Sequence, residues 1–260
     1  MVSCACPLGS IYLDGLFNPY AKFAKHHLPN ISDFGKLRVR RIYSPPPPCI
    51  IQLMRLIICR HGESEANVLR ILSNRDLPHG LTPKGQQQAR DLAEKLANDD
   101  VRLLYASHIL RAQQTAAIVG QRLGLGIHTS TALRDFDCGI YEGRGDPEAW
   151  AAHDALVSAW LTEKDHDRRI PTGESYNDIK ARFVPFLRSL AEQHAAQDGA
   201  ITIIMHGAVM MLFLPALCRN LNHAFGFQNP IPNCGRVVLE PQDDGFICAD
   251  WNGLRPVSAL

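Results

Sequence analysis

The sequence predicts an α/β domain, in which the strands of one sheet alternate with helices along the chain. Two observations support this class. From Met54 onward, short apolar runs alternate with longer segments of helical periodicity. Two of the apolar runs also end in the dipeptide His-Gly, at His61-Gly62 and at His206-Gly207. In an open α/β sheet, the carboxyl ends of the strands form the edge where ligands bind.

The strand candidates are short, strongly apolar runs. The run 55–59 leads into Arg60-His61, and the run 200–205 leads into His206-Gly207. Four more runs of similar length are predicted to be strands: 101–106, 127–131, 236–240 and 246–250.

Three amphipathic helices are predicted between the strands. The first begins at Thr82-Pro83, because threonine is a favourable N-cap and proline suits the first helical position. The second carries an apolar face over 109–123 and ends at Gly124, and the third spans 174–194.

Three other stretches complete the predicted domain. The apolar run 209–214 is too short to cross a membrane and indicates a buried helix. The stretches 133–173 and 220–235 are predicted to be long loops. Because long loops around a site often select the substrate, we expect specificity to lie there.

Composition excludes several classes of protein. At 260 residues, 46% hydrophobic and 20% charged, the chain resembles an ordinary globular protein. A net charge of +1 and the absence of an apolar run of ~18 residues predict neither a nucleic-acid partner nor a membrane partner. The eight cysteines lack disulfide or zinc-site spacing, which favours buried thiols in a reducing compartment. We therefore expect a cytoplasmic protein, either a monomer or a homodimer.

Residues 1–53 differ from the remainder and are predicted to be a separate, poorly ordered extension, followed by one folded domain over 54–260. The extension holds six Lys or Arg against two Asp, and it contains the polyproline stretch 45–48. Two alternatives stay open. The extension could direct import into an organelle, or it could be an upstream segment with no role in the fold, because Met54 stands where a minimal domain would begin.

Arg60-His61 is the most informative pair in the sequence. A histidine at a strand end can be a core residue, a metal ligand or a nucleophile, and a single one is most often a core or turn residue. The second strand ending in His206 favours catalysis, because two imidazoles could meet at one edge. A neutral histidine can attack phosphorus, and an adjacent arginine supplies a planar cation for phosphate oxygens.

Several further segments match the motifs of one protein family, in the same order along the chain, and they support a catalytic role for His61. Residues 60–67 resemble the signature of the histidine phosphatase superfamily, in its phosphoglycerate-mutase-like branch (branch 1). The other matching segments are 81–89, 107–116, 133–144, 173–175 and 205–207. The resemblance covers 54–251 and implies a three-layer α/β/α sandwich around a central, mostly parallel sheet.

The resemblance implies a role for each site residue. His61 would be the nucleophile, and Arg60 and Arg111 would clamp the phosphoryl oxygens. His206 would stand beside them, protonated while phosphate is bound. Further donors to the phosphate would be the side chains of Asn67 and Ser64 and the amide of Gly207. No metal and no cofactor is implied, because cationic side chains supply the positive charge.

The proton donor to the leaving oxygen is expected to be Asp135, where the family usually has glutamate. Aspartate does the same chemistry but must be protonated first, so its pKa should be raised by burial or nearby negative charge. Asp137 and Glu142 are the alternative donors.

The resemblance implies a phosphomonoesterase that hydrolyses a small phosphorylated metabolite through a phosphohistidine. Two alternatives remain: phosphoryl transfer of the phosphoglycerate-mutase type, and a non-catalytic phosphate-binding scaffold. A cluster of basic residues could recognise a second anionic group of the substrate, although a solvated charge run is the favoured interpretation: Lys164, His166, Arg168 and Arg169.

Overall fold

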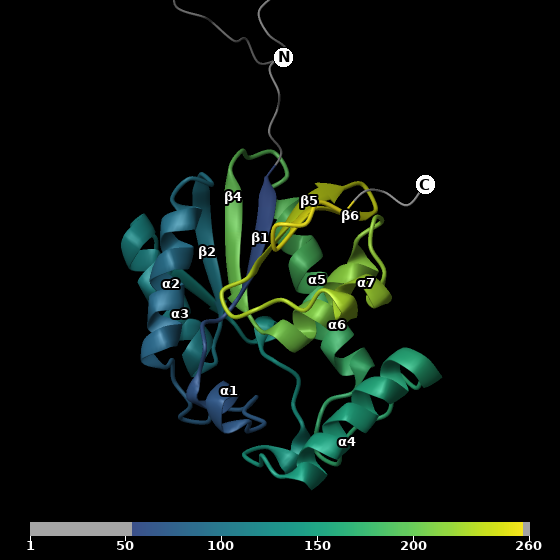
Figure 1. The fold of residues 1–260 in the computed structure, drawn as a ribbon. Helices are drawn as coiled ribbons and strands as arrows, with labels where there is room; N and C mark the ends of the chain where they lie inside the picture. Colours follow the sequence, from purple (N-terminus) through teal and green to yellow (C-terminus); the bar gives the residue numbers. More distant parts are fainter. Residues whose placement is uncertain (1–53, 257–260) are drawn as a thin grey trace, which may run out of the picture. The chain divides into compact units, whose positions relative to one another are not determined.

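The computed structural model describes residues 54–256 (Figure 1). The predicted extension over residues 1–53, with its alternatives, therefore lies outside the described residues, as do 257–260. No helix within 54–256 is long and apolar enough to span a membrane.

One sheet of six strands runs through the domain in the order β3-β2-β4-β1-β5-β6. The first four strands along the chain pair in parallel, whereas β5 and β6 add an antiparallel edge. Each strand forms where the sequence predicts one, and the bounds are β1 Arg55–Arg60, β2 Val101–Ser107, β3 Ile127–Ser130, β4 Ala200–Met205, β5 Arg236–Gln242 and β6 Gly245–Trp251. The predicted central, mostly parallel sheet is confirmed.

Helices cover both faces of the sheet and give the predicted three layers (Figure 1). Side chains of β1 alternate between the two faces, as the pleat requires. Ile57 packs with the apolar faces of α2 (Pro83–Leu96) and α3 (Leu110–Leu123). Leu56 and Ile58 belong to the opposite core, built with α5 (Tyr176–Gln193) and α6 (Gly207–Leu217). Burying both faces explains why β4 is apolar along almost its whole length.

The predicted helix ends are also observed. Thr82 caps α2 by accepting a hydrogen bond from the Gly85 amide at 3.0 Å. Gly124 ends α3 with a positive φ of 69°, a conformation that costs glycine little. The third predicted helix begins at Tyr176, after the N-cap Ser175.

The prediction of long loops at 133–173 and 220–235 is wrong in part. The first stretch contains α4 (Pro147–Ser158), followed by a π-helical turn over Ala159–Glu163, and the second contains α7 (His223–Gln228). Asp146 caps α4 through the Ala149 amide, so an N-cap signal was present in the sequence. The helix has little hydrophobic periodicity, because alanines fill much of it and few of its side chains are buried.

Candidate active site

The carboxyl end of the sheet brings the two histidines together. Arg60 pairs in register with Met205, and the His61 amide donates to the Met205 carbonyl at 2.9 Å. His61 and His206 therefore leave adjacent parallel strands side by side, with their ring centroids 5.3 Å apart. The juxtaposition expected from the two His-Gly strand ends is present in the structure.

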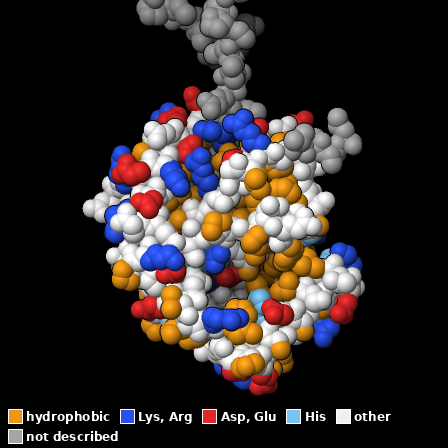
Figure 2. All heavy atoms as spheres, in the orientation of Figure 1, with side chains coloured by type: hydrophobic (Ala, Val, Ile, Leu, Met, Phe, Trp, Pro, Cys, Tyr) orange, Lys and Arg blue, Asp and Glu red, His pale blue; other side chains and the backbone are white. Residues whose placement is uncertain are grey.

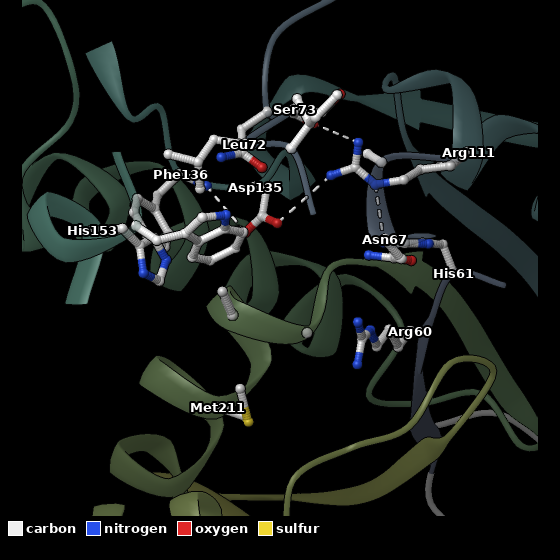
Figure 3. A pocket seen from close by; sticks show the side chains of 16 residues that line it. Arg60, His61, Asn67, Leu72, Ser73, Arg111, Asp135, Phe136, His153 and Met211 are labelled. Carbon is white, nitrogen blue, oxygen red and sulfur yellow. Dashed lines mark hydrogen bonds and ion pairs between the residues drawn. The ribbon is translucent and has the colours of Figure 1, made fainter. Parts of the chain in front are cut away.

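A cavity of about 220 Å³ opens at this edge. Figure 3 shows its labelled side chains converging from several elements. Six of the eight predicted site residues line it: Arg60, His61, Asn67, Arg111, Asp135 and Gly207. The other two, Ser64 and His206, are fully buried behind the lining residues.

Hydrogen bonds fix the tautomer of His61. Its Nδ1 lies 2.6 Å from the Gly62 carbonyl, which can only accept, so Nδ1 carries the proton. Arg111 Nε, which can only donate, lies 3.0 Å from His61 Nε2. Nε2 therefore keeps its lone pair, which accepts the hydrogen bond from Arg111, and the ring that carries it lines the cavity. Burial, followed by the nearby Arg111, lowers the pKa of His61 well below its usual value, which keeps the ring neutral.

His206 is held in place by a serine that the sequence did not single out as a site residue. Ser107, at the end of β2, places its Oγ 2.9 Å from His206 Nε2. The other ring nitrogen, Nδ1, is buried without a hydrogen-bond partner among the described residues and lies 3.9 Å from Asp135 Oδ2. Burial and Arg111 lower the pKa of His206 well below its usual value. An unpaired buried nitrogen next to the cavity is suited to bind an incoming anion.

Two guanidinium groups supply positive charge. Arg111 Nη1 donates to the Ser73 carbonyl at 2.5 Å, and Arg60 Nη1 donates to the Ile231 carbonyl at 2.8 Å. Burial lowers the pKa of both arginines, although an arginine stays charged near neutral pH. Arg111 is thus anchored at two nitrogens, since its Nε also bonds to His61, whereas Arg60 is anchored at Nη1 and its Nε is buried without a partner among the described residues.

Asn67 is oriented by its neighbours. Its Oδ1 accepts hydrogen bonds from the Ser64 amide, the Ser64 hydroxyl and the Asn233 side chain, at 3.1–3.2 Å. Because the oxygen is occupied, Nδ2 is the end of the amide left for a ligand. Ser64 thus contacts Asn67 and is not among the residues that line the cavity.

Gly207 allows the close approach of Arg60 to α6. A Cβ atom at this position would lie 3.0 Å from Arg60 Cδ and Nε. The glycine also begins α6 directly after His206, so its amide belongs to the positive end of that helix.

Asp135 lies within reach of the other site groups. Its Oδ2 is 3.7 Å from Arg111 Nη2, and its side chain is 13% exposed. Burial raises the pKa of Asp135, while Arg111 and the Phe136 amide act in the opposite direction. Desolvation has the larger effect, so the carboxyl holds its proton to higher pH than an exposed aspartate does.

The alternative carboxylates have structural partners. Asp137 pairs with Arg75 at 2.8 Å and accepts from the Gly139 amide. Glu142 accepts from the Asn74 and Cys138 amides. Neither lines the cavity.

The basic cluster over 164–169 is also absent from the cavity lining. Arg168 pairs with Glu163, and Arg169 pairs with Asp178 at 2.9 Å. The ring of His166 stacks on Tyr176. These contacts agree with the interpretation favoured from the sequence, in which the cluster is a run of solvated charges and does not bind substrate.

Comparison with known proteins agrees with this geometry. A family model described as the histidine phosphatase superfamily (branch 1) matches residues 56–253. The chain belongs to this superfamily. The family assignment made from the motifs is thereby confirmed.

The relatives of this histidine phosphatase include phosphatases and a mutase-like protein. It is 30% identical over 173 residues to the glucosyl-3-phosphoglycerate phosphatase of Mycolicibacterium vanbaalenii, covering 64% of this chain and 75% of that protein. It is 27% identical over 206 residues to the "probable phosphoglycerate mutase GpmB" of Enterobacter sp. (strain 638), covering 76% and 90%.

Two solved structures of relatives have the same fold. A mycobacterial glucosyl-3-phosphoglycerate phosphatase in complex with VO3 superimposes with a TM-score of 0.65 at 25% identity, covering 77% of this chain and all of that one. The α-ribazole phosphatase of Shigella flexneri gives a TM-score of 0.63 at 26% identity, covering 76% and 96%.

An ion-pair network beneath Asp135 was not anticipated from the sequence. Arg182, on α5, donates to the main-chain carbonyls of Arg134 and Asp135 at 3.0 and 3.2 Å. Glu174 accepts from both Arg182 and Arg134, and from the Asp137 amide. The side chains of Arg182 and Glu174 are only 13% and 10% exposed. This histidine phosphatase thus holds its Asp135 loop through a largely buried pair.

Removing one member of that pair should destabilise the fold. We expect Glu174→Ala to lower the free energy of unfolding by roughly 3 kcal/mol, because it leaves Arg182 without its buried partner. The control Glu163→Ala removes an exposed pair with Arg168 and should cost less than ~1 kcal/mol. Urea denaturation measures both. Equal losses in the two variants would contradict a structural role for the buried pair.

Proposed function

We propose that this histidine phosphatase is a phosphomonoesterase that hydrolyses a small phosphorylated metabolite through a phosphohistidine on His61. The observation that carries the proposal is the state of that ring. The proton on Nδ1 is held by the Gly62 carbonyl, and Nε2 keeps a lone pair, bonded here to Arg111 Nε, in a ring that lines the cavity with Arg60 and Arg111. A neutral, oriented imidazole beside two guanidinium groups suits in-line attack on a phosphoryl group.

In the first proposed step, His61 Nε2 forms a bond to phosphorus as the bond between phosphorus and the ester oxygen breaks. Asp135 gives its proton to the departing oxygen, which leaves as an alcohol. In the second step, water attacks the phosphohistidine, and the Asp135 carboxylate accepts a proton from that water. Inorganic phosphate leaves, and His61 regains its lone pair. The raised pKa of Asp135 supports its role as the acid.

Charge stabilisation is proposed to come from the surrounding donors. Arg60, Arg111, the Asn67 Nδ2 and the Gly207 amide would contact the phosphoryl oxygens. His206 Nδ1, which lacks a partner among the described residues, would add one more donor. A bound phosphate dianion favours the protonated ring by Coulomb attraction, so His206 would take up a proton when phosphate binds.

These side chains would make a bound metal unnecessary. We expect the protein to release p-nitrophenol from p-nitrophenyl phosphate at the same rate with excess EDTA as with added Mg²⁺. The release is followed at 405 nm after dialysis against the chelator. A rate that falls on chelation and recovers with a divalent cation would contradict the proposal.

Product stoichiometry separates hydrolysis from the mutase alternative. With a metabolite ester as substrate, inorganic phosphate and free alcohol should appear in equal amounts. A deficit of phosphate together with a second phosphorylated product would instead indicate phosphoryl transfer. Binding of phosphate without any turnover would favour the scaffold alternative.

A further inference from the structure

The cavity has two chemically different halves. Arg60, His61, Asn67 and Arg111 lie on one side, and Phe136 and His153 lie on the other, with Asp135 between them (Figure 3). The polar Ser73 and Asn74 also line the cavity, and large apolar side chains line it together with those two rings: Ile71, Leu72, Trp150 and Met211. In Figure 2, hydrophobic side chains gather along one side of the hollow on this face of the protein.

The rings of this apolar half hold one another in place. Phe136 and His153 stack with centroids 5.4 Å apart and an interplanar angle of 22°. Trp150 meets His153 edge to face at 5.1 Å, and its indole N–H donates to the Arg70 carbonyl at 2.7 Å. Phe136 also packs against Trp160, which is fully buried. The wall is therefore formed before a ligand binds, which reduces the entropic cost of binding.

Positive charge is confined to the first half. Among the described residues that line the cavity, the only Lys or Arg side chains are Arg60 and Arg111. Arg70 lies close to the apolar wall, with its Cζ 5.9 Å from the Trp150 ring centroid, but it does not line the cavity. Arg75 is paired with Asp137. A second anionic group on the substrate would thus meet apolar surface, where burying an unpaired charge is costly.

We propose that the substrates of this enzyme are phosphomonoesters of apolar, preferably aromatic, alcohols that carry no second anionic group. This rests on the proposed function above, because Asp135 marks where the leaving oxygen lies. With the phosphoryl group among Arg60, His61 and Arg111, and the ester oxygen at Asp135, the carbon skeleton of the alcohol extends into the apolar half. Phosphoserine and the phosphoglycerates would place a carboxylate there.

The test compares two primary alkyl esters, 2-phenylethyl phosphate and phosphoserine. We expect kcat/KM for 2-phenylethyl phosphate to be at least about tenfold higher, because a hydrophobic pocket discriminates by this much or more. Met211→Lys should reverse part of this preference: kcat/KM for 2-phenylethyl phosphate should fall, and the value for phosphoserine should not fall. The matched control Phe227→Lys, at an exposed position on α7, should leave both values within about twofold.

A second variant tests whether Arg70 binds a second anionic group of the substrate. Arg70→Gln should leave kcat/KM for phosphoserine within about twofold, and a large fall would show that Arg70 binds a second anion and would overturn the proposal. Inhibition by orthovanadate serves as the readout of an intact phosphate half, and it should be unchanged in Met211→Lys and in Arg70→Gln. This control separates lost specificity from lost folding.

The outcomes distinguish the two proposals. If phosphoserine or 3-phosphoglycerate is hydrolysed as well as or better than the aromatic ester, and this activity needs His61, then the substrate class is wrong and the phosphatase mechanism stands. If none of the three esters is hydrolysed, the proposed function and the substrate class both fail.

Discussion

Replacing His61 by alanine is expected to abolish phosphomonoester hydrolysis, with a loss of roughly 10⁴- to 10⁶-fold in kcat, as for removal of other covalent nucleophiles. The physical reason is that the Gly62 carbonyl holds the proton on Nδ1, which leaves Nε2 with the lone pair that is proposed to attack phosphorus. Release of p-nitrophenol measures the loss. The control His194→Ala removes a histidine just beyond the C-terminal end of α5 and should retain wild-type rates.

A chemical trap extends this prediction. Acid-labile, base-stable phosphate should appear on wild-type protein quenched during turnover, and it should be missing from His61→Ala. Fragmentation mass spectrometry would locate it on the peptide that contains residue 61. Label on another residue, or a His61→Ala variant that still turns over at the wild-type rate, would contradict the nucleophilic role.

Replacing Asp135 by asparagine should slow the hydrolysis of alkyl phosphates by ~10²–10⁴-fold, the usual contribution of a general acid. An alkoxide is a poor leaving group and needs the proton, whereas p-nitrophenolate leaves without one. The variant should therefore retain much more of its rate toward p-nitrophenyl phosphate, and the ratio of the two losses is the measurement. Asp137→Asn is the matched control, because Asp137 is paired with Arg75 away from the cavity lining. If Asp137→Asn shows the larger leaving-group effect, the acid lies there instead.

The pH profile gives an independent check on Asp135. The acid must be protonated, so activity toward alkyl phosphates should fall as pH rises through the raised pKa of Asp135. The nucleophile must be neutral, and because the pKa of His61 is lowered well below 6.5, activity should persist on the acid side of that value. We therefore expect an optimum on the acid side of neutrality. In Asp135→Asn, the fall in activity at high pH should disappear. If that fall persists, it is caused by the titration of another group.

The sequence alone was sufficient for the architecture and for the attacking side of the site. Burial on both faces makes the central strands nearly continuous apolar runs, so their positions could be read directly. Parallel strands share their carboxyl edge, which is why His61 and His206 could be placed together from two His-Gly strand ends. The family motifs then added Arg111, Asn67 and Asp135, all of which line one cavity.

Contacts between distant segments could not be predicted in this way. The helix α4 has weak periodicity, and it meets Phe136 through the ring of His153, while the π-helical turn that follows meets Phe136 through the buried Trp160. The Glu174–Arg182 pair holds the Asp135 loop from another helix, and neither residue suggested that role by its own neighbourhood.

The sequence by itself thus determined the sheet, its carboxyl edge and the residues proposed to contact a phosphoryl group, because strand periodicity and short motifs are local properties. Only the tertiary structure decided that Ser64 bonds to Asn67 and does not line the cavity, that Asp135 and neither Asp137 nor Glu142 lines it, and that apolar side chains share the lining with the charged ones. Those features depend on which side chains meet across segments far apart in the chain, where packing and desolvation act together.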